Sequence, residues 1–257
     1  MANLLTPDIC VIGAGSAGLS VAAAAAAFGV EVVLIEKGLM GGDCLNYGCV
    51  PSKALLAAAR AAHTQEAASR FGVHGDKPEV DFAVANDHVR KVIAAIEPHD
   101  SQERFEGLGV TVLRETARFT GSDEVLAGAV RIKARRFVIA TGSSAFVPPI
   151  PGLEDVPYLT NETLFQLRDR PEHLAIIGGG PIGLEMAQAH RRLGSKVTVL
   201  EAQKALGKDD PELAALVLDT LRAEGIDILE QTAVEKVGRS GAGLVISAKG
   251  ADGKPVT

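Results

Sequence analysis

The chain has 257 residues, which is enough for two domains that each bury a core of their own. Its formal net charge is −6 and it has no run of basic residues, which argues against nucleic acid or an anionic membrane surface as a partner. The N-terminus lacks the features of a signal sequence, and no apolar run reaches the roughly 18 residues of a membrane span, so we expect a cytoplasmic protein.

The first predicted element is a buried strand over residues 8–12 that runs directly into a glycine motif, GAGSAG. An apolar helix to Phe28 and a second strand over residues 31–35 follow. This order is the dinucleotide-binding fingerprint in the context it requires: the glycines allow the turn and the approach of a pyrophosphate, and the helix N-terminus offers N–H groups to it. An acid at the end of the second strand suits an adenosine ribose. The candidate residues of this first site are Gly13, Gly15, Ser16, Ala17, Gly18, Glu36 and Lys37.

The next stretch, GGDCLNYGCVPSKALL over residues 41–56, contains two of the three cysteines. On an ideal helix the Cα atoms of Cys44 and Cys49 would be about 8–9 Å apart, beyond the limit of about 7 Å for a disulfide. A bridge between them therefore needs a distorted turn, which Gly48 permits, and Pro51 is suited to begin the following helix. Lys53 shares a helix face with Cys49, so this sulfur is the one favoured as a thiolate.

The pattern treats the two sulfurs differently, with Cys44 left as the partner that exchanges with a substrate. Two alternatives are a zinc ligand pair and two buried thiols. Zinc usually requires closer spacing and further Cys or His ligands, and none lie nearby in the sequence, so no metal site is predicted.

Two helical patterns follow, over residues 54–69 and 80–106, and we expect Pro98 to bend or interrupt the second. Short alternating segments from Val110 to Val138 predict a small antiparallel meander inserted into the first domain. A strand end then gives Ala140, Thr141, Gly142 and Ser143, which fit a close approach of the backbone to a cofactor or an ordinary turn. Prolines 148, 149 and 151 place the domain boundary between residues 149 and 150.

The fingerprint returns in the second half of the chain at a constant offset of 165 residues. A strand over 173–177, the motif GGGPIG, a helix to Leu193 and a strand over 196–200 reproduce the first unit. Two such sites imply two dinucleotide cofactors. The candidate residues of the second site are Gly178, Gly180, Pro181, Ile182, Gly183, Glu185 and Glu201.

The remaining polar residues give no further site. The six histidines have neither ligand spacing nor an acid partner, and we interpret them as surface or structural residues. Cys10 lies inside the first strand, where it is expected to be a small apolar core residue. The overall prediction is an α/β protein with two tandem Rossmann-like, three-layer ββα dinucleotide-binding domains over residues 1–149 and 150–257, the second incomplete at its C-terminus.

The stretch around the two cysteines resembles the redox helix of the class I pyridine nucleotide-disulfide oxidoreductases, within the group of dihydrolipoamide dehydrogenase and mercuric reductase, which carry GGTCLNxGCxPSKALL or close variants. The resemblance covers residues 8–257 and implies FAD in the first site and NAD(P)H in the second. It implies that Cys49 is the charge-transfer thiolate, that Cys44 is the interchange thiol, and that Lys53 is a cation near the flavin, paired with Glu185. It further implies cofactor contacts for Gly41, Gly42, Asp43, Ala117, Thr141 and Gly142.

The mechanism implied by the resemblance is electron transfer from NADH through the flavin to a Cys44–Cys49 disulfide, and from there to a disulfide, dithiol or metal-ion substrate. Glu201 favours NAD(H) over NADP(H), because a carboxylate accepts a ribose 2′-OH and repels a 2′-phosphate, although Lys204 lies close in the sequence. Two other classes remain open, an oxidase, peroxidase or monooxygenase with the same repeat, and a nucleotide-binding module without catalysis.

Several positions depart from the family pattern. Asp43 replaces a usual threonine, Tyr47 a usual apolar residue, and Pro181 an aromatic residue that gates the nicotinamide pocket in several relatives. Relatives also continue for about a further domain, which supplies the dimer interface and a His/Glu acid–base pair. We therefore expect these 257 residues to be catalytically impaired on their own and the full-length relatives to be homodimers.

Overall fold

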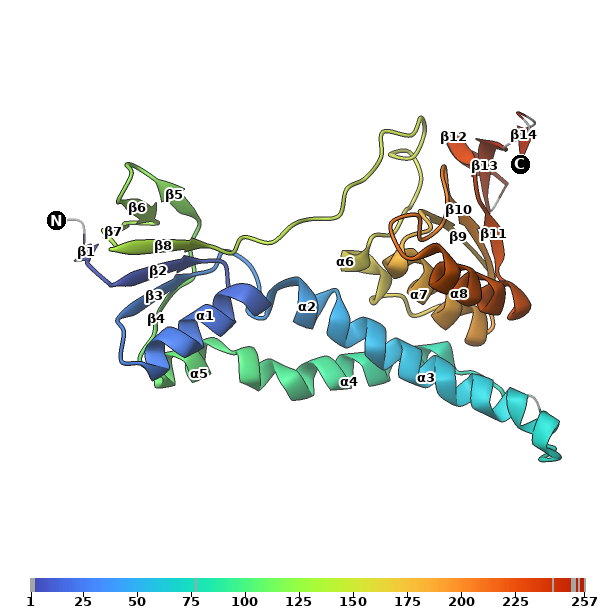
Figure 1. The fold of residues 1–257 in the computed structure, drawn as a ribbon, viewed down its shortest axis with the longest axis horizontal. Coiled ribbons are helices and arrows are strands. Elements are labelled where there is room, and N and C mark those ends of the chain that lie inside the picture. The colour runs from blue at the N-terminus through green and yellow to red at the C-terminus, as the bar shows by residue number, and fades with distance from the viewer. Residues whose placement is uncertain (1–2, 77, 242, 251–252, 254, 257) are drawn as a thin grey trace. The chain divides into compact units, whose positions relative to one another are not determined.

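The computed structural model describes residues 3–76, 78–241, 243–250, 253 and 255–256 (Figure 1). The chain forms two compact units, one made of Met1–Pro51 with Arg90–Ala145, the other of Ser52–Val89 with Phe146–Thr257. This division differs from the predicted boundary at residues 149/150, because residues 52–89 pack with the second half of the chain. No helix within the described residues is both long and apolar enough to span a membrane.

The first unit is built on a parallel sheet with the strand order β4-β3-β2-β8. Its strands are β2 (Ile9–Ile12), β3 (Val32–Ile35), β4 (Thr111–Leu113) and β8 (Arg136–Ile139). Every residue of β3 is buried, as expected of a parallel strand that is covered on both faces. The predicted α/β class and the first strand–helix–strand unit are confirmed.

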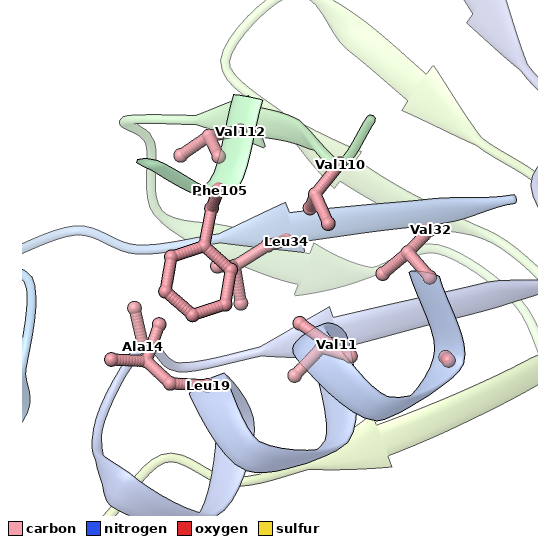
Figure 2. Close-up of a cluster of buried hydrophobic side chains, with 10 residues drawn as sticks. Val11, Ala14, Leu19, Val32, Leu34, Phe105, Val110 and Val112 are labelled. Atoms are coloured by element: carbon pink, nitrogen blue, oxygen red, sulfur yellow. The ribbon is translucent and has the colours of Figure 1, made fainter. Parts of the chain in front are cut away.

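Helices α1 (Ser16–Ala27) and α5 (Gln102–Gly107) cover one face of this sheet. Figure 2 shows the core between them, where Phe105 of α5 packs beside Leu34 of β3, and Leu19 of α1 lies below Val11 of β2. Phe105 is 1% exposed and is among the largest fully buried side chains among the described residues. The apolar helix of the fingerprint is therefore fixed to the sheet by a core that also includes a helix about 80 residues later in the chain.

The opposite face of the same sheet carries the predicted meander. Along β2 and β3, Cys10, Val33 and Ile35 alternate with the residues of the first core, so their side chains point to the opposite face. There they pack against Val125 and Ile132. Strands β5 (Ala117–Phe119), β6 (Val125–Ala127) and β7 (Val130–Ile132) are antiparallel, and β1 (Asn3–Leu5) adds to β7 in parallel. The prediction that the whole stretch 110–138 forms the meander is wrong at its ends, since β4 and β8 belong to the parallel sheet.

The second unit repeats this plan with the parallel order β11-β10-β9. Strands β9 (His173–Ile177) and β10 (Lys196–Leu200) have the predicted bounds, and β11 is Asp227–Leu229. Helices α7 (Pro181–Arg192) and α8 (Pro211–Ala223) bury Leu184, Leu218 and Leu221 against Val197 and Val199. A short helix, α6 (Asn161–Leu164), precedes β9.

The described C-terminal residues form a three-stranded antiparallel sheet. It consists of β12 (Ala233–Ser240), β13 (Gly243–Lys249) and β14 (Pro255–Val256). Val237 of β12 packs against Leu153 and Val156, so the proline-rich segment before β9 is anchored on this sheet.

Four helical segments lie between β3 and α5. They are α2 (Gly42–Asn46), α3 (Cys49–Ala67), the 3₁₀ turn η1 (Ala68–Phe71) and α4 (Phe82–Asp100). The predicted start at Pro51 is two residues late, because Pro51 lies in the first turn of α3, where its missing N–H is tolerated. Pro98 lies inside α4, and the break comes at Ser101, whose hydroxyl caps α5 by accepting the N–H of Arg104.

Candidate functional site

The first fingerprint loop leaves no room for side chains at two of its glycines. Gly13 has a φ of 106°, and a Cβ on it would lie 2.1 Å from the carbonyl oxygen of Ala140. A Cβ on Gly18 would lie 1.8 Å from the carbonyl oxygen of Gly13. The structure therefore brings the Ala140–Thr141 segment, predicted from the end of the meander, directly against the fingerprint loop.

The two glycines before Cys44 pack on the same loop. Gly41 donates its N–H to the carbonyl oxygen of Ala14 at 2.9 Å and pairs with Gly15. Gly42 has a φ of 58°, and a Cβ on it would lie 2.6 Å from the Cα of Gly15. The backbones of the fingerprint and of the cysteine segment are thus in direct contact, which ties the predicted dinucleotide site to the cysteines.

Glu36 closes the first loop from the end of β3. One carboxylate oxygen accepts the N–H of Ala14 at 2.6 Å and the other accepts the N–H of Gly38 at 2.6 Å. The Arg114 guanidinium donates to the carbonyl oxygen of Gly38. Sequence reasoning missed Arg114, because only the pairing of β4 with β3 brings it to this turn.

The second loop repeats the hydrogen bonds of the acid and the close contact of the third glycine. Gly178 has a φ of 116°, and a Cβ on Gly183 would lie 2.3 Å from the carbonyl oxygen of Gly178. Glu201 accepts the N–H of Gly179 at 2.7 Å and the N–H of Gln203 at 2.8 Å. The offset of 165 residues seen in the sequence therefore holds for the hydrogen bonds as well as for the glycines.

The helices that follow the two loops share an unusual N-terminus. Helices α1 and α7 have glycine N-caps, Gly15 and Gly180, with no side-chain cap and no acid in the first turn. By contrast, Ser101, Thr160 and Asp210 cap α5, α6 and α8 with their side chains. N–H groups left without a side-chain cap at a helix N-terminus suit an anionic ligand such as a phosphate.

Cys44 and Cys49 lie on either side of a break between two helices. Cys44 is in α2, Cys49 is the first residue of α3, and Tyr47 and Gly48 form the turn between them. A Cβ on Gly48 would lie 2.9 Å from a carboxylate oxygen of Asp43, so the turn also depends on a glycine. The segment thus has the distorted turn that a bridge between the two sulfurs requires.

In this structure the two cysteines are present as thiols in hydrogen-bond contact. That hydrogen bond with Cys49 is the largest cause that raises the pKa of Cys44, followed by burial, and the charge of Asp100 acts in the same direction. Cys10, in contrast, is fully buried in β2, and burial raises its pKa to about 12. Cys44 is half-buried and Cys49 exposed, so these two sulfurs are accessible whereas that of Cys10 is not.

Lys53, one turn after Cys49 on α3, forms an ion pair within the second unit. Its Nζ atom lies 2.8 Å from both carboxylate oxygens of Glu185 on α7. The structure thus contains the ion pair that the family resemblance implied. The Lys53 side chain is 61% exposed and that of Glu185 is 37% exposed, so the pair contributes little to stability and both groups are accessible.

The other predicted residues lie in more open positions. Thr141, Gly142 and Ser143 are exposed after β8, and Ala117 begins β5. Pro181 is the first residue of α7, and Ile182 beside it is 70% exposed. Near the end of β10 a cavity of about 460 Å³ is lined by Ala202, Gln203, Lys204, Gln231 and Gly250.

Comparisons with known proteins give a consistent result. Residues 7–256 match the family model described as pyridine nucleotide-disulphide oxidoreductase. A mercuric reductase from Streptomyces lividans is 38% identical over 252 residues, covering 96% of this chain and 53% of the relative. A mercuric reductase from Lysinibacillus sphaericus is 34% identical over 235 residues, covering 91% of this chain and 43% of the relative.

Among solved structures, the chain is similar to the HOCl-induced flavoprotein disulfide reductase RclA from Escherichia coli, as its Cu(II) complex. The TM-score is 0.80 with 29% sequence identity, and the match covers 95% of this chain and 52% of that one. The chain therefore spans about half the length of the relatives it matches.

Proposed function

This chain belongs to the pyridine nucleotide-disulphide oxidoreductase family, and from that membership we propose that it passes two electrons from a reduced nicotinamide nucleotide, through FAD, to a disulfide formed by Cys44 and Cys49. The dithiol then reduces a disulfide or metal-ion substrate. The observation that carries this proposal is the contact between the two sulfurs across the turn at Gly48. The segment that holds them begins at Gly41, which pairs with Gly15 of the fingerprint loop.

The residues of the first unit fit FAD. The segments at Gly13, at Gly42 and at Ala140 converge with backbone contacts too close for any Cβ, beside a helix N-terminus without a side-chain cap. Such a cradle accepts a pyrophosphate, with the α1 amides of Ser16 and Ala17 as donors. When bound, FAD supplies the redox chemistry, which is hydride acceptance from the nicotinamide and two-electron transfer to the disulfide.

The chain's own residues would divide the remaining work. Cys49, at the start of α3, is favoured as the thiolate, and Cys44 is the sulfur that exchanges with the substrate. The Lys53 ammonium, held at 2.8 Å by both oxygens of Glu185, would place a positive charge in a fixed direction one turn beyond Cys49. We propose that this ion pair orients the cofactors and contributes little to the stability of the fold.

NAD(H) is the proposed nicotinamide cofactor. Each Glu201 oxygen already accepts one backbone N–H and has a further lone pair for a ribose hydroxyl. A 2′-phosphate at the same position would be repelled by this carboxylate, which disfavours NADP(H). Lys204, which lines the neighbouring cavity, would attract the phosphate and so weaken the preference for NAD(H). The names of the relatives include a mercuric reductase and a disulfide reductase, so a metal ion and a disulfide are the two substrate classes to test.

The direct test is to count thiols after reduction by NADH. The purified chain, loaded with FAD and oxidised, should gain two titratable thiols for each NADH consumed under anaerobic conditions, located by mass spectrometry at Cys44 and Cys49. Cys44→Ser and Cys49→Ser should each abolish the gain while bound FAD remains. Loss of flavin absorbance without new thiols at these positions would contradict the proposal.

Turnover is a separate question from this half-reaction. The expectation that these 257 residues turn over slowly stays a prediction, which steady-state assays with lipoamide and with mercuric ion would test. Rates equal to those of full-length relatives would contradict it.

A further inference from the structure

Asp100 occupies a position that ordinary helix chemistry disfavours. It is the half-buried last residue of α4, where the aligned backbone dipoles place partial negative charge. Within the described part of the chain its carboxylate forms neither an ion pair nor a side-chain hydrogen bond. A residue that breaks a local rule without compensation is more often explained by function than by stability.

The carboxylate of Asp100 lies against the N-terminal end of α2. Its Oδ2 atom is 3.1 Å from the point that a Cβ on Gly41 would occupy, and Leu45 fills the remaining space there. Gly41 is the N-cap of α2, and Cys44 is the third residue of that helix. The negative charge of Asp100 is thereby held close to one of the two sulfurs.

The two sulfurs consequently have different surroundings. The hydrogen bond with the Cys49 side chain, burial and the charges of Cys49 and Asp100 raise the pKa of Cys44, while a hydrogen bond with the Cys49 backbone acts in the opposite direction. Both sulfurs lie in the first turn of a helix, where the amides favour a negative charge, but only Cys49 has a cation, Lys53, one turn later in its own helix. The asymmetry assigned to the cysteines from sequence spacing therefore has a second source, on a different helix.

Building on the proposed function, we propose that Asp100 is a positioning residue of the dithiol, whose negative charge keeps the proton on Cys44 and leaves the thiolate on Cys49. On reduction, two electrons break the S–S bond, one proton binds at Cys44, and the negative charge remains on Cys49. The electrons come from the reduced nicotinamide through the flavin.

The test measures the reactivity of each sulfur, not turnover. The flavin-loaded chain is reduced and treated with iodoacetamide, a neutral reagent, across a series of pH values. Both cysteines lie on one tryptic peptide, residues 38–53, and its fragment ions give the alkylation rate of each. In Asp100→Asn, Cys44 should react faster at neutral pH and its rate should rise at lower pH than in the parent chain.

The size of the effect follows from two opposing changes. A lower pKa raises the thiolate fraction of Cys44, while the less basic thiolate is a weaker nucleophile, so we expect a net gain in rate of about threefold. Glu97→Gln removes an exposed carboxylate from the same helix and should leave both rates unchanged. Asp100→Glu keeps the negative charge and should behave like the parent chain, which a purely structural role for the aspartate would not predict.

Two outcomes overturn the inference in distinguishable ways. If Asp100→Asn leaves the Cys44 rate and its pH dependence unchanged while the oxidised chain still forms the Cys44–Cys49 disulfide, this role of Asp100 is wrong and the proposed function stands. If oxidation never joins the two cysteines, the proposed function is itself wrong.

Discussion

Glu36 and Glu201 each accept two backbone N–H groups, in addition to any part they play in binding a ribose. One comes from the preceding glycine loop, at Ala14 or Gly179, and the other from the residue two positions after the acid, at Gly38 or Gln203. The sequence pattern assigns these acids to the ligand only, because an acid after the second strand is a signature of ribose binding. The structure shows that the same carboxylate also shapes the loop. A substitution at Glu201 therefore changes two properties together.

We predict that Glu201→Gln weakens NADH binding by about 10- to 100-fold, since it loses a charge-assisted hydrogen bond of about 1.5–3 kcal/mol. NADPH binding should weaken less, because the repulsion of its 2′-phosphate is removed at the same time, and the preference for NADH should narrow. Dissociation constants from fluorescence titration of both nucleotides measure this change. Glu36→Gln is the matched control and should affect retention of FAD but not NADH; an unaltered NADH/NADPH ratio in Glu201→Gln would refute the assignment.

At the scale of elements, helix α7 carries two ion pairs of different character. Near its N-terminal end Glu185 pairs with the exposed Lys53. In its last turn Arg192 donates two hydrogen bonds to Glu224, just after α8, at 2.8 and 2.6 Å, with side chains only 15% and 11% exposed. The first pair is the one we propose to orient the cofactors, and the second joins α7 to the end of α8.

Removing one partner of the buried pair should be costly. We predict that Arg192→Met lowers the free energy of unfolding by about 2–4 kcal/mol, because the largely buried Glu224 keeps only the hydrogen bond from Gln188 and loses its counter-charge, whereas Lys53→Met lowers it by less than about 1 kcal/mol. Burial alone would raise the pKa of Glu224, but the hydrogen bonds and charge of Arg192, with Gln188, outweigh it and the pKa is lowered.

The sign of the pH dependence follows from that lowered pKa. A carboxylate with a depressed folded-state pKa stabilises the fold above its unfolded value of about 4.3, and this contribution disappears as pH falls through the folded value. The difference between Arg192→Met and the parent chain should thus shrink below about pH 4, as followed by urea unfolding. A difference that is constant with pH would mean that packing, not charge, joins α7 to α8.

Elements whose signals are local could be predicted from the sequence, and those that depend on distant partners could not. The bounds of β9 and β10 follow from short apolar runs, one ending at Gly178 and the other beginning after Gly194, and the structure has them as predicted. The alternating pattern of β4 and β8 was assigned to the meander, because a strand's own residues do not reveal which sheet it joins. Asp100 and Arg114 were missed for the same reason, since their roles depend on contacts with residues far away in the sequence.

At the scale of the whole molecule, the repeat implies two nucleotide sites that use the same device in two separate units. In each, the third glycine of the motif is where a side chain would collide with the carbonyl oxygen of the first, at 1.8 Å for Gly18 and 2.3 Å for Gly183. Because each contact lies inside its own unit, the two sites can be removed one at a time.

We predict reciprocal losses. Gly183→Ala should keep its bound FAD but lose the stabilisation by NADH, which is about 2.7 kcal/mol at a concentration 100 times the dissociation constant. Gly18→Ala should lose FAD yet still be stabilised by NADH, because its second loop is intact. Flavin absorbance after gel filtration and unfolding with and without NADH measure the two properties. Gly107→Ala and Gly238→Ala, where an added Cβ meets no neighbour and φ is not positive, are the matched controls. If Gly183→Ala also released the flavin, the two loops would not be independent, and the repeat would describe one composite site in place of two.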